Sequence, residues 1–430
     1  MYSINKKRNN VLYNDSIEKV KISLPEKNFL DFIEIEEPKK LKFPKDYRKS
    51  MDNTIKSDKL KNLAKGSKKV VIIVSDATRG IPTGKVLPFV IDDLIDVGID
   101  LKHINIIIAL GVHRPATKSE MKEIVGEKYF EKIKIINHNG FDKKNLVYLG
   151  ETSLGTPIEV NKTVYEADFK IIIGKVEPHE FAGFSGGRKS ILPGVSSEKT
   201  IESNHRPEML LNENARPGVM LNNPVNEDMA EAAEILGVDF AINIVQNIRA
   251  DVVGIFSGDI FESHLKAVEY MRSVYSVGLK ERPDIIVTTP GRPLNIDFYQ
   301  SIKPIIALAP IIKKNGVIVM YSECREGVNS VDMLKPYEES STVEDVVEYL
   351  MSNYKIQMDH ALLLSKIMQK KIKIVVYSPN IDNSVLKKMF IETADSPQDA
   401  LEKAYKLTEE KEPKVLFFPQ PQRTLPKLGK

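Results

Sequence analysis

The sequence predicts an α/β protein of two domains, each built on a mostly parallel sheet flanked by helices. The chain has 430 residues, which is too long for one ordinary domain. Short Val- and Ile-rich runs alternate along it with amphipathic segments, as in doubly wound folds. These runs are continuously apolar, which indicates strands buried on both faces of a parallel sheet. We expect the active site in the cleft between the two domains.

The repeated unit is a strand, a turn that is polar or contains glycine, and an amphipathic helix. Three such units precede the middle of the chain and a fourth lies in its second half. The strand and helix ranges are 68–76 with 83–98, 104–111 with 117–130, 169–176 with 196–205, and 284–290 with 296–316, followed by a strand at 316–323.

A domain boundary is predicted near residues 278–283, where a glycine and the charged turn LKERPD follow a helix. The N-terminal domain would span 1–279, with its first sixty residues adding a β-rich edge that includes NVLYNDSIEKVKISL. The second domain would span 280–405. The segment 406–430, which contains KVLFFPQPQ, would return to the first domain.

Charge and composition exclude several classes of protein. The 62 basic and 59 acidic residues are interleaved, so no basic surface for nucleic acid or an anionic membrane is predicted. No run of 18 apolar residues suggests a membrane span, and the polar N-terminus does not resemble a secretory signal. Because Cys324 is the only cysteine, an internal disulfide and a cysteine-based zinc site are excluded. We therefore expect a cytoplasmic protein.

Two of the seven histidines follow predicted strands, where ligands bind in open α/β sheets. His113 follows the second strand and His179 follows the third. Imidazole titrates near neutral pH, so the pair could act as general bases on opposite faces of one substrate. A solvated or structural histidine is the alternative at each position.

The loop at 178–196 is rich in glycine. Gly183, Gly186 and Gly187 would allow a ligand to approach the backbone, and successive amides could form an anion-binding nest. The string GFSGGRKS lacks the Gly-Lys-Ser/Thr adjacency of a phosphate-binding loop, so a nucleotide hydrolase is rejected. Lys189 is either a surface lysine or a reactive amine, and His205 ends the helix that follows.

Polar groups also occur at the first strand end and on a helix of the second domain. Arg79 could hold a carboxylate or phosphate, and Asp76 and Thr78 could bind a ribose or phosphate, or all three could simply form a turn. Gln300 and Lys303 are three residues apart, so they share a helix face. They would suit an anionic substrate, although a solvated helix face is the preferred explanation from these residues alone.

Four strings occur in order over residues 75 to 303: SDATRG, LGVHRP, KVEPHEFAGFSGGRKSILPGVSSEKTIESNH and FYQSIK. They closely resemble the nickel-dependent lactate racemase family. The long central string is highly specific, and the short ones gain weight from their order and spacing. The resemblance covers both predicted domains.

The resemblance implies a nickel-pincer nucleotide, a nicotinic acid derivative in which one carbon and two sulfurs hold nickel. Lys189 would carry it through a covalent thioamide link, and His205 would be the protein ligand to nickel. Asp76, Thr78 and Arg79 would contact the nucleotide or the substrate. The domain at 1–279 would then bind the cofactor, which biosynthesis proteins would load.

The resemblance also implies the reaction, a reversible hydride transfer that racemises a small 2-hydroxy acid. His113 and His179 would be the acid/base pair, while Arg79, Gln300 and Lys303 would hold the substrate. The domain at 280–405 would be the substrate domain. Lactate is the expected substrate, with interconversion of its D and L forms.

One feature departs from the family pattern. The chain has no tryptophan, whereas the lactate pocket of the family has an aromatic wall that includes one. The corresponding segment here is DHALLLSKIMQKK at 359–371. A malate-like, longer aliphatic or sugar acid is therefore an alternative substrate. A metal-assisted hydrolase using His113, His179 and His205, and a non-catalytic cofactor-binding protein, are alternatives of other classes.

Overall fold

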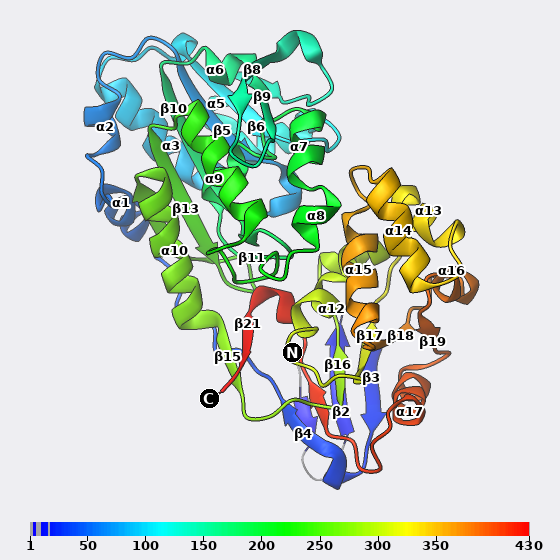
Figure 1. Cartoon of the computed structure of the whole chain (residues 1–430). Helices are drawn as coiled ribbons and strands as arrows, with labels where there is room; N and C mark the ends of the chain where they lie inside the picture. The colour runs from blue at the N-terminus through cyan, green and yellow to red at the C-terminus, as the bar shows by residue number, and fades with distance from the viewer. Residues whose placement is uncertain (1–2, 6–9, 16–17, 430) are drawn as a thin grey trace. The chain divides into compact units, whose positions relative to one another are not determined.

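The computed structural model describes residues 3–5, 10–15 and 18–429. The chain folds into two compact units (Figure 1). Residues 37–274 form one, called the central unit here, and residues 1–36 together with 275–430 form the other, called the terminal unit. None of the helices in the described ranges is long and apolar enough to cross a membrane.

The central unit is built on a six-stranded sheet in the order β14-β13-β10-β5-β6-β7. All neighbours are parallel except β13 and β14. Val70 to Val74 of β5 are fully buried, which explains the unbroken apolar run in the sequence. The strands are β5 (Val70–Ser75), β6 (Ile104–Ala109), β7 (Lys134–Asn137), β10 (Phe169–Lys175), β13 (Phe240–Gln246) and β14 (Val252–Gly258).

Helix α3 (Thr83–Asp96) covers one face of this sheet, because its Val86, Leu87 and Leu94 share a buried cluster with Ile72 and Ile106. The helix predicted at 117–130 is divided by Gly126. The other helices are α1 (Lys45–Asp52), α2 (Leu60–Leu63), α4 (Lys118–Val125), α5 (Glu127–Phe130), α6 (Lys162–Tyr165), α7 (Glu198–Asn204), α8 (Pro207–Leu210), α9 (Pro224–Leu236) and α10 (Ile260–Tyr275).

Strand β5 fixes where a ligand site can form in the central unit. From β5 the chain proceeds to β6 and β7 on one side, and β10 and β13 lie on the other. The strand order therefore reverses between β5 and β10, and ligands bind outside the carboxyl ends of strands at such a switch point. The segments after β5, β6 and β10 carry most of the predicted site residues.

The terminal unit has a six-stranded, all-parallel sheet in the order β19-β18-β17-β16-β20-β4. Helix α17 (Pro397–Leu407) covers one face, where Leu401 packs in a buried cluster with Val317 and Phe417. The strands are β4 (Phe29–Phe32), β16 (Ile285–Thr288), β17 (Val317–Tyr321), β18 (Lys373–Tyr377), β19 (Glu392–Thr393) and β20 (Val415–Phe417). The other helices are α11 (Phe298–Ser301), α12 (Lys303–Leu308), α13 (Val331–Glu338), α14 (Val343–Asn353), α15 (Asp359–Gln369) and α16 (Asn383–Lys388).

Both ends of the chain belong to the terminal unit, which differs from the predicted division at 1–279, 280–405 and 406–430. Strand β4 pairs with β20, so this N-terminal strand belongs to the sheet of the terminal unit and not to an edge of the first domain. Strand β20, which lies in KVLFFPQPQ, also pairs with β16, so this segment does not return to the first domain. The physical reason is that Val415 to Phe417 are fully buried and take neighbours on both sides. The pattern at 10–23 does form strands, β2 (Asn10–Asp15) and β3 (Glu18–Ser23), which join β1 (Ser3–Asn5) in a separate sheet; residues 16 and 17 lie outside the described residues.

The helix predicted at 296–316 is two short helices, α11 and α12, with Ile302 between them. Pro304 has no amide hydrogen to donate to the carbonyl of Gln300, so one helical hydrogen bond is missing at this point, which favours a break. Gln300 therefore lies in α11 and Lys303 begins α12, rather than both lying on one continuous helix.

Candidate active site

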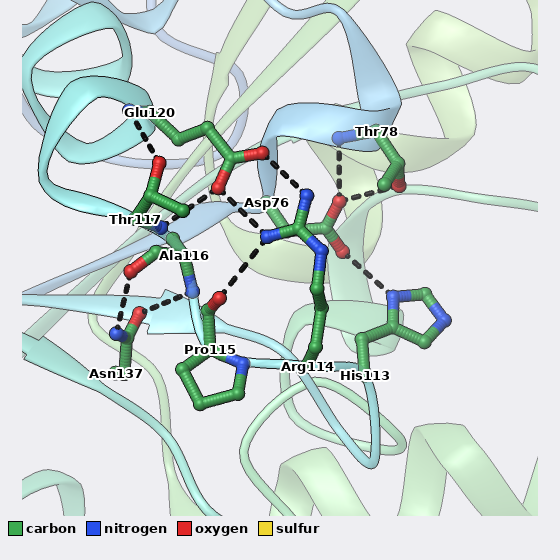
Figure 2. Close-up of polar contacts among 9 residues, drawn as sticks. All are labelled: Asp76, Thr78, His113, Arg114, Pro115, Ala116, Thr117, Glu120 and Asn137. Carbon is green, nitrogen blue, oxygen red and sulfur yellow. Dashed lines mark hydrogen bonds and ion pairs between the residues drawn. The ribbon is translucent and has the colours of Figure 1, made fainter.

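His113 and Asp76 meet at the carboxyl ends of β6 and β5 (Figure 2). The imidazole Nδ1 of His113 lies 3.1 Å from Oδ2 of Asp76. The other carboxylate oxygen, Oδ1, accepts hydrogen bonds from the Thr78 amide at 2.8 Å and from the Thr78 hydroxyl. The Asp76 side chain is 6% exposed, whereas that of His113 is 44% exposed. The pair therefore presents a buried carboxylate behind an accessible imidazole.

The charge state of Asp76 determines which tautomer of His113 is favoured. Burial alone would raise the pKa of Asp76, but the hydrogen bond with His113 and the positive charge of Arg79 outweigh it and hold this pKa well below its usual range. An ionised carboxylate at Nδ1 favours the tautomer with its hydrogen on that atom. The Nε2 of His113 then carries a lone pair and can accept a proton.

The loop that carries His113 is fixed by contacts on its far side (Figure 2). Arg114 donates two hydrogen bonds to Glu120, at 2.8 and 2.6 Å. Glu120 also closes a capping box with Thr117 at the start of α4. Asn137 bonds the amide and carbonyl of Ala116, at 3.2 and 3.0 Å. Arg114 therefore supports the loop, and His113 is the group presented from it.

A small hairpin follows β10 and brings three predicted site residues together. Strand β11 (Pro178–His179) pairs with β12 (Gly183–Phe184), and Phe181 lies in the turn between them. The Phe181 ring centroid is 4.7 Å from that of His179 and 4.9 Å from that of His205, both in edge-to-face geometry. Lys189 Nζ lies 5.6 Å from the same centroid. The sequence interpretation missed Phe181.

Lys189 lies on a single turn of 3-10 helix, η5 (Gly187–Ser190), after the predicted glycine-rich loop. Two amides of the predicted anion-binding nest already donate to acceptors within the protein. The Gly187 amide donates to Asn243 Oδ1 at 3.0 Å, and the Lys189 amide donates to the Gly186 carbonyl at 3.1 Å. Because these amides already have protein acceptors, the glycines serve the folding of the loop around Lys189.

Gly194 joins the Lys189 segment to the loop of His113. Its amide donates to the Lys189 carbonyl, and its own carbonyl accepts from the Gly111 amide at 2.9 Å. A Cβ at Gly194 would lie 2.3 Å from the Ser190 carbonyl oxygen, so a side chain does not fit here. The two hydrogen bonds of Gly194 therefore link the segments that carry His113 and Lys189.

Two buried groups beneath the loop were also missed from the sequence. Arg188 is 2% exposed, and its Nη2 donates to the carbonyls of Ala182 and Phe184 at 2.9 and 3.0 Å. His264 Nε2 lies 2.8 Å from the Ser185 carbonyl and 3.2 Å from Arg188 Nη1. Burial lowers the pKa of Arg188 to about 9. Burial and the Arg188 charge together lower the pKa of His264 to about 3.

His264 predicts an acid-sensitive fold. The unfolded chain binds a proton at this histidine near pH 6.5, whereas the folded chain does so only near pH 3. His264 therefore stabilises the folded state above pH 6.5, and this contribution is lost as the pH falls from 6.5 towards 3. We expect the free energy of unfolding to fall more steeply between pH 6.5 and 4.5 in the wild type than in His264→Leu. The two slopes should differ by at most about 1.4 kcal/mol per pH unit, the effect of one proton. Denaturant titrations at both pH values measure this, and equal slopes would contradict it.

Helix α7 places His205 at its C-terminal end. Ser197 caps the start of the helix by accepting from the Thr200 amide. Asn204, the last helical residue, donates to Oδ2 of the fully buried Asp228 at 2.7 Å. Thr156 donates to the same oxygen at 2.7 Å. His205 is therefore held at a rigid helix end, 9% exposed.

The predicted residues of the terminal unit lie around α11. Asp297 caps this helix by accepting from the Gln300 amide at 2.7 Å. The hydroxyl of Tyr299 donates to Asp359 at 3.1 Å, and its ring lies 4.1 Å from that of His360. The first residues of 359–371, the segment predicted to replace the aromatic wall, thus contact the FYQSIK motif. The roles of Asp359 and His360 were not visible in the sequence pattern.

The described residues contain no group of three or more His, Cys, Asp or Glu side chains arranged to hold a metal ion. The three-histidine zinc site of the hydrolase alternative therefore has no support among them. His205 can supply one imidazole ligand, which suits a metal whose other ligands arrive with a cofactor.

The fold and the two strand-end histidines define an α/β enzyme suited to moving protons on a small ligand. Family models give the same class: the lactate racemase N-terminal domain matches residues 13–218 and the lactate racemase C-terminal domain matches 279–421. The chain belongs to the lactate racemase family, whose members are isomerases, and membership implies a nickel-dependent enzyme.

Relatives of the chain support this assignment over most of its length. Lactate racemase of Thermoanaerobacterium thermosaccharolyticum is 34% identical over 359 residues, covering 82% of this chain and 84% of that protein. Lactate racemase of Lactiplantibacillus plantarum is 34% identical over 364 residues, covering 83% and 85%. The solved lactate racemase apoprotein of T. thermosaccharolyticum superposes with a TM-score of 0.90 at 30% identity, covering 97% of this chain and all of that one.

Proposed function

We propose that this protein is a lactate racemase that interconverts D- and L-lactate by reversible hydride transfer. The observation that carries the proposal is the His113–Asp76 pair, an accessible imidazole oriented by a buried carboxylate in a chain of this family. A second histidine, His179, follows strand β10, which lies on the other side of β5 from β6. Reversible hydride transfer needs a base for the hydroxyl proton of each enantiomer, and two histidines could meet that need.

The proposed cofactor is a nickel-pincer nucleotide linked covalently to Lys189, with His205 as the protein ligand to nickel. The Lys189 amine and the His205 imidazole both contact the phenyl ring of Phe181. This shared contact supports the proposal that both residues bind the same cofactor. Asp76, Thr78 and Arg79 would contact the nucleotide. When bound, the cofactor supplies the acceptor for the hydride of the substrate C2.

The chain's own residues carry the proton steps. His113 Nε2 takes the hydroxyl proton of one enantiomer, and ionised Asp76 stabilises the resulting imidazolium. After the planar 2-keto acid turns over and C2 regains the hydride on its other face, a protonated His179 would give its proton to the ketone oxygen and so re-form the hydroxyl group. Arg79, Gln300 and Lys303 would hold the substrate carboxylate or the ketone oxygen, because cations and amides match those charges.

We further propose that the enzyme works in the cytoplasm, where cofactor-biosynthesis proteins load it. Cys324, the only cysteine, is a buried free thiol, which suits a reducing compartment. The partners are then the loading proteins and a small 2-hydroxy acid.

The test is a chiral assay of the cofactor-loaded protein on lactate, malate, a longer aliphatic 2-hydroxy acid and a sugar acid. We expect lactate to racemise from either enantiomer. Turnover of another acid but not of lactate would show that the proposed substrate is wrong and that the proposed type of reaction is right. The missing tryptophan and the 359–371 segment favour this alternative. No turnover of any acid by nickel-loaded protein would contradict the proposal.

A further inference from the structure

We propose that Phe181 is a positioning residue that sets the spacing of His179, Lys189 and His205. The inference rests on the proposed function, which gives these three residues their roles as acid/base, tether and metal ligand. All three contact one phenyl ring, although they come from three different local elements: the hairpin strand β11, the turn η5 and the end of helix α7.

The backbone around Phe181 is fixed on both sides of the ring. Its carbonyl accepts a hydrogen bond from Asn223 Nδ2 at 2.8 Å. The carbonyl of the next residue, Ala182, accepts from the buried guanidinium of Arg188 at 2.9 Å. The ring itself is 4% exposed. The phenyl group is therefore a rigid surface rather than a side chain free to change rotamer.

A phenyl ring can orient an imidazole without using its nitrogen atoms. The rings of His179 and His205 meet Phe181 at interplanar angles of 81° and 78°, the edge-to-face arrangement that aromatic quadrupoles favour. A polar residue in the place of Phe181 would compete for the ring nitrogens. Nδ1 of His179 already lies 3.3 Å from Oε2 of Glu180. The phenyl group packs against both imidazoles without adding a further partner to their nitrogen atoms.

The same ring also guides Lys189. Its ammonium group lies 5.6 Å from the centroid, within the range of a cation–π contact. The quadrupole of the phenyl ring attracts the ammonium group at this distance. We infer that Phe181 keeps the Lys189 amine close to His205 before the cofactor is attached.

The experiment compares Phe181→Leu with the matched variant Phe184→Leu. Phe184 belongs to the same hairpin and is fully buried, but its ring faces the guanidinium of Arg272 at 5.6 Å. Both variants lose the same atoms from the same small element. The first measurement is the NMR spectrum of the imidazole groups in the cofactor-free chain, and the second is kcat and KM of the loaded enzyme.

We expect Phe181→Leu to shift the imidazole signals of both His179 and His205, because the ring current of the phenyl group is removed. We expect kcat to fall about 10- to 100-fold, since small misplacements of reacting groups have effects of this size, with KM little changed. Phe184→Leu should leave both imidazole signals and kcat unchanged. Equal effects in the two variants, or none in Phe181→Leu, would overturn the proposal.

If Phe181→Leu fails to fold, an NMR measurement on the wild-type chain still tests whether Phe181 contacts both histidines. Cross-relaxation between the Phe181 ring protons and the imidazole protons of His179 and His205 is expected in the cofactor-free protein, and its absence would overturn the inference. These NMR results do not depend on turnover. A loaded wild type that racemises no acid, with both cross-peaks present, would therefore contradict the proposed function and leave the geometric role of Phe181 standing.

Discussion

Lys189→Ala is expected to yield a folded protein that carries neither the cofactor adduct nor nickel. The amine is the proposed point of covalent attachment, and the described residues offer no protein metal site that would retain the ion by itself. Intact-mass and metal measurements after co-expression with the loading proteins check this result. We expect complete loss of the mass increment and of racemase activity.

Two variants make this result specific. Lys199→Ala removes a neighbouring lysine on α7 that is 69% exposed, and it should keep the adduct and the nickel. His205→Ala should keep the covalent adduct and lose nickel, because it removes the proposed metal ligand alone. An adduct that persists in Lys189→Ala, or zinc bound without an adduct in the wild type, would contradict the assignment of the tether.

The strands that carry the site could be predicted because parallel sheets leave a simple signal. A strand buried on both faces must be apolar throughout, so β5, β6, β10 and β16 were visible as Val- and Ile-rich runs. The residues just after such strands are then candidates for a site, which is how His113 and His179 were found. Two of these candidates, His113 and Asp76, lie 3.1 Å apart.

The division of the chain into units was harder to predict, because pairing between distant strands leaves no local signal. Strand β4 at the N-terminus and β20 near the C-terminus pair across almost the whole chain. Each is short and apolar, and nothing in either segment identifies its partner. Pro304, in contrast, is a local signal for the break between α11 and α12, although α3 and α13 each continue through a proline.

The supporting residues of the site were missed for a related reason. Phe181, Arg188 and His264 act through contacts that arise when the chain folds back after β10, and each has a common structural explanation by itself. A fully buried arginine that donates to backbone carbonyls is recognised only once its burial is known. Motif reasoning finds groups that do chemistry, whereas the groups that hold them are found through packing.

His113→Ala and His179→Ala are each expected to lower the rate of racemisation by about 10²- to 10⁴-fold while nickel stays bound, since this is the usual contribution of a general acid/base. The two variants should differ in which half-reaction survives. Each loses the base for one enantiomer and keeps the base for the other. Acid quenching of the loaded enzyme with a single enantiomer should therefore release 2-keto acid from D-lactate in one variant and from L-lactate in the other.

Asp76→Asn extends this prediction to the orientation of His113. An amide no longer favours the tautomer with hydrogen on Nδ1 and cannot stabilise the imidazolium, so the variant should behave as a partial His113→Ala and impair the same enantiomer. Because Asp76 lies 3.1 Å from His113, the effects of the two substitutions should not add in the double variant. Full activity in either histidine variant, or loss of the same half-reaction in both, would show that the two histidines do not serve opposite faces of the substrate.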